Sequence, residues 1–310
     1  MFIANNELRV NGGSLLKFLP VRIRRYLYGV DMEGLEELRL RLGQPVSLYF
    51  NDGCYYVSNK GQLSRIPANC VTVQRNDIDE GLELATGSSV YAVEDEIKNG
   101  YITISGGHRV GLCGSAVLSK DRISFIKNIS GLNYRFAREI TGAADKAMPV
   151  IYKDGKIQNT LFISPPGCGK TTMLRDVARS LANHGKKVSI VDERKEIAGM
   201  VEGRSSFDLG FSTDVLEGCC KDEGMLLMLR SMSPDVIITD EIGKTEDIRA
   251  IEKIIHGGVN IITSIHGTGR EQILHRADMK MLFSYFDCFI TLGKKRHPGS
   301  IEEVYEREWE

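Results

Sequence analysis

The chain has 310 residues, of which 42% are hydrophobic and 26% charged, and its net charge is −1. These values exclude a disordered chain, argue against a strongly basic nucleic-acid binder, and are ordinary for a globular protein of two domains. No stretch approaches the roughly 18 apolar residues of a membrane-spanning helix, and Met1 to Val10 lack the apolar segment of a signal peptide. We therefore predict a cytoplasmic protein. The seven cysteines form no Cys-x-x-Cys pair, which predicts reduced thiols and no zinc site.

The first part of the chain mixes helical and strand patterns. The predicted helices are 14–28, 77–85 and 90–98, and the predicted strands are 38–42, 46–50, 101–105, 109–118 and 123–128. This order predicts a smaller α+β domain, to which we assign residues 1–142.

Strands and helices alternate in the second part, residues 143–310. The predicted strands are 161–163, 188–191, 236–239 and 259–264, and the predicted helices are 170–183, 221–231 and 246–256. Such alternation predicts an α/β domain, in which helices cover a parallel sheet and ligands bind at the carboxyl ends of the strands. We expect residues 301–310 to form a short edge strand that runs into a solvated end.

A glycine-rich segment joins the first of these strands to the first helix and reads Ser164-Pro165-Pro166-Gly167-Cys168-Gly169-Lys170-Thr171-Thr172. Free amides at a helix start bind anions, glycines let the backbone curve around phosphates, and the lysine reaches the terminal phosphates. We therefore predict that residues 166–172 bind ATP and that the Thr171 hydroxyl is a ligand of Mg²⁺. Ser164 replaces the usual first glycine, which the extended conformation favoured before Pro165 permits. Cys168 is expected to be a reactive thiol that ATP shields.

Polar residues end three of the other predicted strands. Asp240 is predicted to hold magnesium through water, and Glu241 to orient the water that attacks the γ-phosphate. Asp192 and Glu193 could polarise that water from another side, or they could simply end a strand with charges. His266 could sense the γ-phosphate, or it could be structural.

Together these segments resemble the ATPases of type II and type IV secretion systems and of pilus retraction, which carry a phosphate loop, two acidic motifs and a histidine box in this order. The chain departs from that pattern at Asp240, where those ATPases usually carry glycine, and at Lys244, where many carry arginine. Over nearly its whole length the chain is more closely similar to the stage III sporulation protein AA family. The segments that carry this similarity are 106–111, 132–139, 164–172, 191–194 and 240–241.

The resemblance implies a RecA-like P-loop ATPase, and a hexamer on the mother-cell side of a channel that joins mother cell and forespore. It also implies membrane-protein partners and a peripheral position at the membrane. The near-neutral charge and the lack of an obvious aromatic and basic platform predict that nucleic acid is not a partner. By the same resemblance, Arg109 and Arg135 could close over the nucleotide, although both could be ordinary exposed arginines. Two other functions stay open at this point: a nucleic-acid-dependent RecA-like NTPase, and a nucleotide-gated scaffold that does not hydrolyse ATP.

Overall fold

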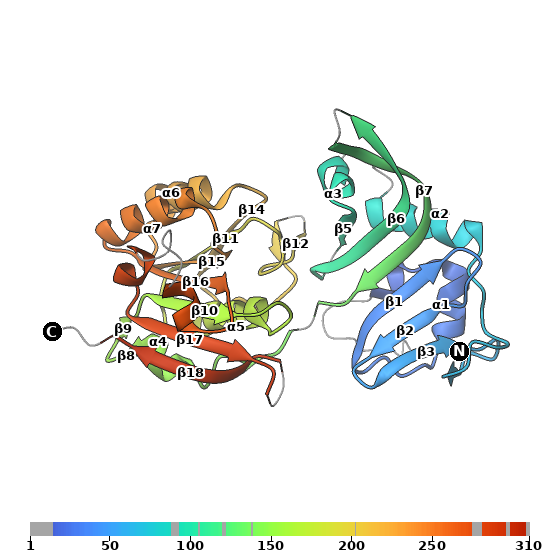
Figure 1. Cartoon of the computed structure of the whole chain (residues 1–310), viewed down its shortest axis with the longest axis horizontal. Helices are drawn as coiled ribbons and strands as arrows, with labels where there is room; N and C mark the ends of the chain where they lie inside the picture. The colour runs from blue at the N-terminus through green and yellow to red at the C-terminus, as the bar shows by residue number, and fades with distance from the viewer. Residues whose placement is uncertain are drawn as a thin grey trace, which may run out of the picture. The chain divides into compact units, whose positions relative to one another are not determined.

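The computed structural model describes residues 15–87, 93–104, 106–119, 122–137, 139–201, 203–274, 281–295 and 298–307. The chain forms two compact units, whose elements are labelled in Figure 1. Unit 1 is Met1–Arg138 with Val201–Ser206, and unit 2 is Glu139–Met200 with Phe207–Glu310. The domain boundary proposed from the sequence, after residue 142, lies near the change of unit at residue 138. The sequence did not indicate that residues 201–206 belong with unit 1.

Unit 1 contains an antiparallel seven-stranded sheet in the order β4-β3-β2-β1-β7-β6-β5. Its strands are β1 (Leu35–Arg41), β2 (Ser47–Phe50), β3 (Gly53–Val57), β4 (Leu63–Ser64), β5 (Tyr101–Ile104), β6 (His108–Ser119) and β7 (Arg122–Arg135). Its helices are η1 (Leu15–Phe18), α1 (Val21–Leu27), α2 (Arg75–Thr86) and α3 (Glu94–Lys98).

One predicted helix of unit 1 is interrupted. The sequence favoured a continuous helix over 14–28, but a short 3-10 helix ends at Phe18 and α1 begins after Pro20. Proline has no N–H to donate, so it fits before the first turn of a helix and not inside one. The predicted cap Ser14, and residues 90–92 of another predicted helix, lie outside the described residues.

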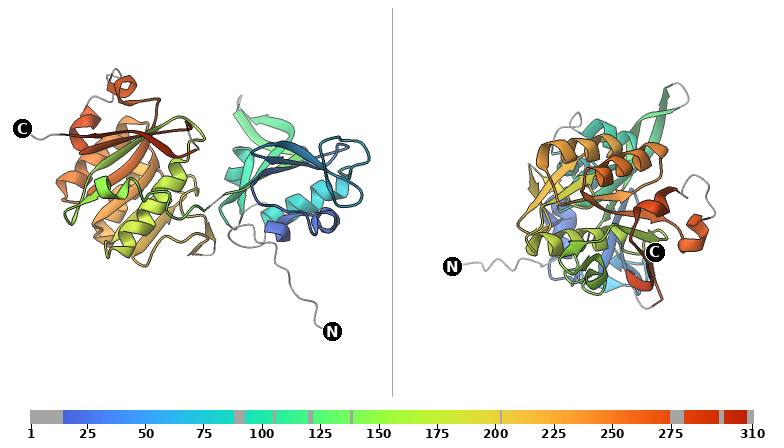
Figure 2. Two further views of the ribbon diagram at one scale, coloured as in Figure 1. Left: turned by 90° about the horizontal axis from the view of Figure 1, so that it is seen from below. Right: turned by 90° about the vertical axis from the view of Figure 1, so that its left-hand side faces the viewer.

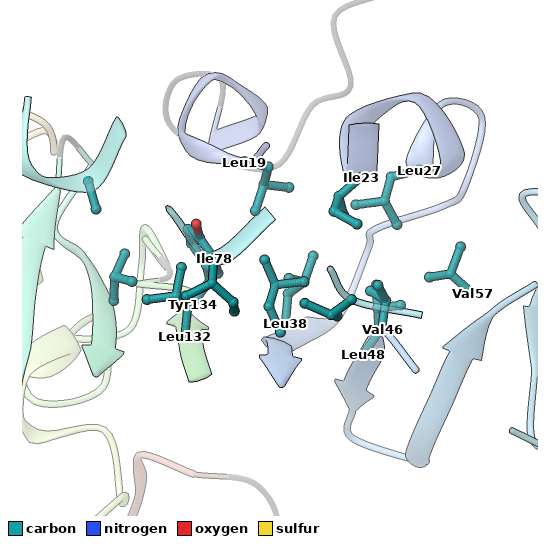
Figure 3. Close-up of a cluster of buried hydrophobic side chains, with 14 of the residues drawn as sticks. Leu19, Ile23, Leu27, Leu38, Val46, Leu48, Val57, Ile78, Leu132 and Tyr134 are labelled. Atoms are coloured by element: carbon teal, nitrogen blue, oxygen red, sulfur yellow. The ribbon is translucent and has the colours of Figure 1, made fainter. Parts of the chain in front are cut away.

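The core of unit 1 lies between its helices and one face of its sheet (Figure 3). In β1, Leu38 and Leu40 are fully buried and alternate with half-buried Arg39 and Arg41, as the period of a strand requires. The hydroxyl of buried Tyr134 donates a hydrogen bond to the Phe18 carbonyl oxygen at 3.1 Å. Full burial of an aliphatic side chain such as Leu38 or Leu40 contributes about 1.5–3 kcal/mol to the stability of the fold.

Unit 2 contains a second seven-stranded sheet in the order β14-β11-β15-β16-β10-β17-β18, parallel except for β18. Its strands are β10 (Thr160–Ser164), β11 (Val188–Asp192), β14 (Thr213–Glu217), β15 (Val236–Glu241), β16 (Asn260–His266), β17 (Cys288–Gly293) and β18 (Ser300–Glu306). Its helices are α4 (Met148–Ile151), α5 (Lys170–Asn183), α6 (Lys221–Met232), α7 (Thr245–His256), α8 (Arg270–Leu274) and η4 (Met281–Tyr285). Two small hairpins complete the described elements: β8 (Tyr152–Lys153) with β9 (Lys156–Ile157), and β12 (Met200–Val201) with β13 (Arg204–Ser205).

The helices of unit 2 cover both faces of its sheet. In the right-hand view of Figure 2, α6 and α7, in orange, lie together on one side and α5, in light green, lies on the other. Strands buried on both faces read as continuous apolar runs, as β10 and β15 do. Because β10, β11, β15 and β16 are parallel, their carboxyl ends meet at one edge of the sheet. Within the described part of the chain, no helix is both long and apolar enough to cross a membrane.

Candidate functional site

The glycine-rich loop between β10 and α5 is curved as an anion-binding loop requires. Gly167 and Gly169 have φ angles of 67° and 77°, a region that glycine enters without strain. Gly169 also stands at the N-cap of α5 and has no side chain to accept the first amides of the helix. Those amides are therefore available to an anion in the loop.

Lys170, the first residue of α5, is held at the carboxyl edge of the sheet. Its ammonium donates to the Ser164 carbonyl oxygen at 3.4 Å and lies 3.2 Å from Glu241 Oε2. The Lys170 side chain is 14% exposed and that of Glu241 is 35% exposed. The structure thus brings together a loop lysine and a strand-end acid that are 71 residues apart in the sequence.

Asp240 and Glu193, the other acids of interest, meet at one buried lysine. Lys221, the first residue of α6, lies 3.2 Å from Asp240 Oδ1 and also pairs with Glu193. Burial raises the pKa of Asp240 to about 6, and the nearby Lys221 ammonium offsets part of that rise. The pKa of Lys221 is raised because the two carboxylates outweigh its own burial. The predicted acids therefore share one ion-pair network, although the sequence did not suggest its cation.

Asp192, next to Glu193, has a structural role. Its Oδ1 accepts the N–H of Glu196, and its Oδ2 accepts the N–H groups of Ile197 and Ala198, each at 2.9 Å. The buried guanidinium of Arg175 donates to the carbonyl oxygens of Ile197 and Glu196, both at 2.7 Å. Burial raises the pKa of Asp192, opposed by these backbone hydrogen bonds. Both oxygens of the Asp192 carboxylate therefore accept hydrogen bonds from the backbone, and Asp192 orders the loop after β11.

The remaining predicted residues of unit 2 lie around the phosphate loop. His266 is exposed at the end of β16, where it pairs in register with Ser164 of β10. Thr171 and Thr172 are half-buried in the first turn of α5. Pro166 is exposed in the loop. Cys168 corrects our expectation of a reactive thiol, because only 3% of it is exposed and its Sγ faces the Pro166 carbonyl oxygen at 3.8 Å.

Arg109 and Arg135 lie in unit 1, on neighbouring strands. They stand directly opposite each other in the register of β6 and β7. The Arg109 guanidinium lies over the Tyr101 ring at 4.3 Å from its centre, and Arg135 Nε is 3.6 Å from Glu37 Oε1. Arg135 thus has a carboxylate partner on β1, while Arg109 and Arg135 place two like charges opposite each other on β6 and β7.

Lys221 and Arg175 are the site residues that sequence analysis missed. Lys221 carried one available signal, because a lysine in the first turn of a helix opposes the helix dipole. Nearby carboxylates would stabilise such a lysine, and the predicted strand-end acids Glu193 and Asp240 could have been proposed as its partners. Arg175 gave no signal, since its partners are backbone carbonyls of a loop far away in the sequence.

Comparisons with known proteins agree with this architecture. A family model described as sporulation stage III, protein AA, matches residues 11–310. Stage III sporulation protein AA of Bacillus subtilis (strain 168) is 38% identical over 282 residues, covering 88% of this chain and 87% of that protein.

Solved structures show the fold. The ATPase DotB of Legionella pneumophila matches with a TM-score of 0.54 at 15% identity, covering 89% of this chain and 76% of that chain. The pilus retraction motor PilT, solved with bound ADP, matches with a TM-score of 0.57 at 12% identity, covering 89% and 77%. Unit 2 thus has the RecA-like fold of the secretion ATPases and follows a smaller α+β unit, as the sequence predicted. By the match over residues 11–310 and the identity to the Bacillus protein, the chain belongs to the sporulation stage III protein AA family.

Proposed function

We propose that this protein is a magnesium-dependent ATPase of the secretion type. The observation that carries the proposal is the meeting of Lys170 with Glu241, next to Asp240, beside the curved phosphate loop. In parallel α/β sheets, the carboxyl edge of the strands is where ligands bind. A loop cation and two strand-end acids at that edge are the groups that phosphoryl transfer uses.

In this proposal the phosphates lie in the loop formed by residues 166–172. The N–H groups of Gly167, Cys168, Gly169, Lys170 and Thr171 face the phosphate oxygens, because Pro165 and Pro166 have none to donate. Lys170 moves from Glu241 to the terminal phosphates. Thr172 and Pro166 border the loop on either side.

Thr171 and Asp240 are suited to hold magnesium. Asp240 is buried at the end of β15, and its Oδ1 lies 3.2 Å from the Lys221 ammonium. Magnesium takes oxygen ligands and keeps several waters, so the Thr171 hydroxyl can bind the ion directly while Asp240 holds it through one of those waters. When bound, the ion would neutralise charge that develops on the phosphate oxygens. A cation there would also lower the raised pKa of Asp240 and keep its carboxylate ionised.

We assign water positioning to Glu241. It ends β15 with its side chain partly exposed, so its carboxylate can accept a hydrogen bond from a water aligned on the γ-phosphate. His266 is proposed to contact that phosphate from the end of β16. Glu193 acts as a second acid, linked to Asp240 through Lys221.

Arg109 and Arg135 are proposed to stabilise the transition state. Their opposed positions on β6 and β7 place two positive charges side by side, where an anionic ligand could contact both. An interaction made chiefly in the transition state lowers turnover without an equal loss of affinity. Alanine at either position should therefore lower the hydrolysis rate, while ATP affinity and melting temperature stay near those of the wild type.

The family supports a cellular role for this activity. We propose that the protein works as a homo-oligomer, a hexamer by resemblance, in the cytoplasm at the membrane. Membrane proteins of a sporulation channel would hold it there, and ATP hydrolysis would drive or gate transport from mother cell to forespore. Light scattering of the protein with ATP, with ADP and without nucleotide would give its molar mass and hence the number of subunits in each state.

The decisive experiment is ATP hydrolysis by the full chain with magnesium, with EDTA, and with added single-stranded DNA or RNA. We expect magnesium-dependent turnover that nucleic acid leaves unchanged, and no turnover or tight ATP binding in Lys170→Ala. Lys253→Ala, which changes an exposed lysine of α7, is the matched control. Stimulation by nucleic acid would indicate a nucleic-acid-dependent NTPase instead. Binding without turnover under every condition would indicate a nucleotide-gated scaffold.

A further inference from the structure

Lys294 and Gly299, at the two ends of the connection between β17 and β18, lie against the glycine-rich loop. A Cβ atom on Gly167 would be 3.3 Å from Lys294 Nζ, and one on Gly169 would be 3.2 Å from Gly299 Cα. The topology explains this contact, because β17 is the parallel neighbour of β10 and ends at the same edge of the sheet. Lys294 follows the last residue of β17, and Gly299 precedes the first residue of β18. At Gly169 the close backbone of Gly299 adds to the positive φ in favouring glycine, whereas at Gly167 the near atom is the mobile end of Lys294.

The ammonium of Lys294 lies beside the glycine-rich loop, where a Cβ on Gly167 would approach it. The amides of the loop present N–H donors, which cannot bind an ammonium, and the Lys170 ammonium is already paired with Glu241. Within the described residues Lys294 is exposed and has no carboxylate partner, whereas its neighbour Lys295 lies 3.2 Å from Glu302 Oε2. An oxyanion in the loop is the group that would satisfy both the N–H donors and the Lys294 ammonium.

Lys170 and Lys294 lie toward different sides of β10. Lys170 is directed toward Glu241 at the end of β15, which lies beyond β16 from β10. Lys294 comes from β17, on the opposite side of β10. A chain of phosphates in the loop would therefore have one cation from each side of β10.

Resting on the nucleotide site proposed above, we propose that Lys294 is a second phosphate-binding residue. It would contact the oxygens of a nucleoside polyphosphate next to Gly167, while Gly299 packs against the start of α5. Its role is to bind phosphate, so it should contribute to the affinity for ATP and ADP. A charge-assisted hydrogen bond of this kind is worth about tenfold or more in affinity.

The test compares Lys294→Met with Lys295→Met in the full chain. Titrations with ATP, ADP and adenosine, each at low and at high salt, would measure affinity and its salt dependence. We expect Lys294→Met to lower the affinity for ATP and for ADP by about tenfold and to make that affinity less dependent on salt. The affinity for adenosine, which has no phosphate, should not change. Lys295→Met should stay within about twofold of the wild type, because its exposed pair with Glu302 contributes little. Lys294→Arg, which keeps the charge, should recover part of the loss.

Two results would overturn this role for Lys294. One is equal ATP affinity in Lys294→Met and Lys295→Met. The other is a lower melting temperature of nucleotide-free Lys294→Met, which would assign the side chain to packing. Wild-type protein that binds no ATP would instead refute the nucleotide site itself, so the two failures can be told apart.

Discussion

Lys170 Nζ lies 3.2 Å from Glu241 Oε2, so the loop lysine and the acid that ends β15 neutralise each other. A bound triphosphate must compete with Glu241 for the same ammonium. Since the pair is partly exposed, its net worth is only about 0.2–1 kcal/mol, which a triphosphate can readily exceed. The pair also keeps both side chains near the positions that binding and hydrolysis would use.

The first prediction follows from this competition. Glu241→Gln should lower the rate of ATP hydrolysis by about 100-fold or more, because it removes the acid to which we assign alignment of the attacking water. ATP affinity should rise by up to about fivefold, because Lys170 no longer has a competing carboxylate. Single-turnover hydrolysis and equilibrium binding would measure the two effects separately. Glu246→Gln, in the exposed first turn of α7, is the control, and normal turnover in Glu241→Gln would remove Glu241 from the mechanism.

The second prediction concerns the buried cation between the acids. Lys221→Met leaves Asp240 and Glu193 without their shared partner, and removing one side of a buried pair costs about 3–5 kcal/mol. Asp240 already has a pKa of about 6, and loss of Lys221 raises it further. At pH 5.5 the carboxyl can therefore take up a proton, so the melting temperature should fall less at pH 5.5 than at pH 7.5. Lys253→Met is the control, and an equal fall at both pH values would contradict this account.

The sequence was sufficient where local pattern decides structure. Helix α5 has the predicted bounds. Asp240, Glu241 and His266 lie at strand ends, as predicted, and these ends could be located because buried parallel strands appear in the sequence as apolar runs. It was insufficient where distant segments meet. Strands β14 and β17 were not predicted, and without β17 the position of Lys294 on the phosphate loop could not be inferred. The Lys221 network likewise depends on three elements whose packing no local pattern specifies.

The third prediction replaces the reactive thiol expected at Cys168. Because only 3% of Cys168 is exposed, iodoacetamide should label it far more slowly than exposed Cys113 and Cys220 in the native protein. Peptide mass spectrometry over a time course would give the three rates, and denatured protein would provide the reference for each. Labelling of Cys168 as fast as of Cys113 would show that the loop opens often enough to expose the thiol.

The last prediction concerns the dependence of stability on pH and rests on His108 of unit 1. Its side chain is buried, its Nδ1 accepts the Ala137 N–H at 3.0 Å, and burial lowers its pKa from 6.5 to about 4. As the pH falls below about 6.5, His108 therefore takes up a proton in the unfolded chain but stays neutral in the folded chain.

His108 thus stabilises the fold fully above pH 6.5, and this contribution, about 3 kcal/mol, is lost as the pH falls toward 4. In His108→Asn the amide oxygen can still accept the Ala137 N–H, but the side chain does not titrate. We expect the variant to be less stable than the wild type at pH 7.5, through lost packing, and to lose less stability between pH 7 and pH 4.5. Urea unfolding followed by circular dichroism would measure both slopes, with exposed His256→Asn as the control. If His108→Asn and the wild type lose stability in parallel over this range, the acid sensitivity of unit 1 arises elsewhere.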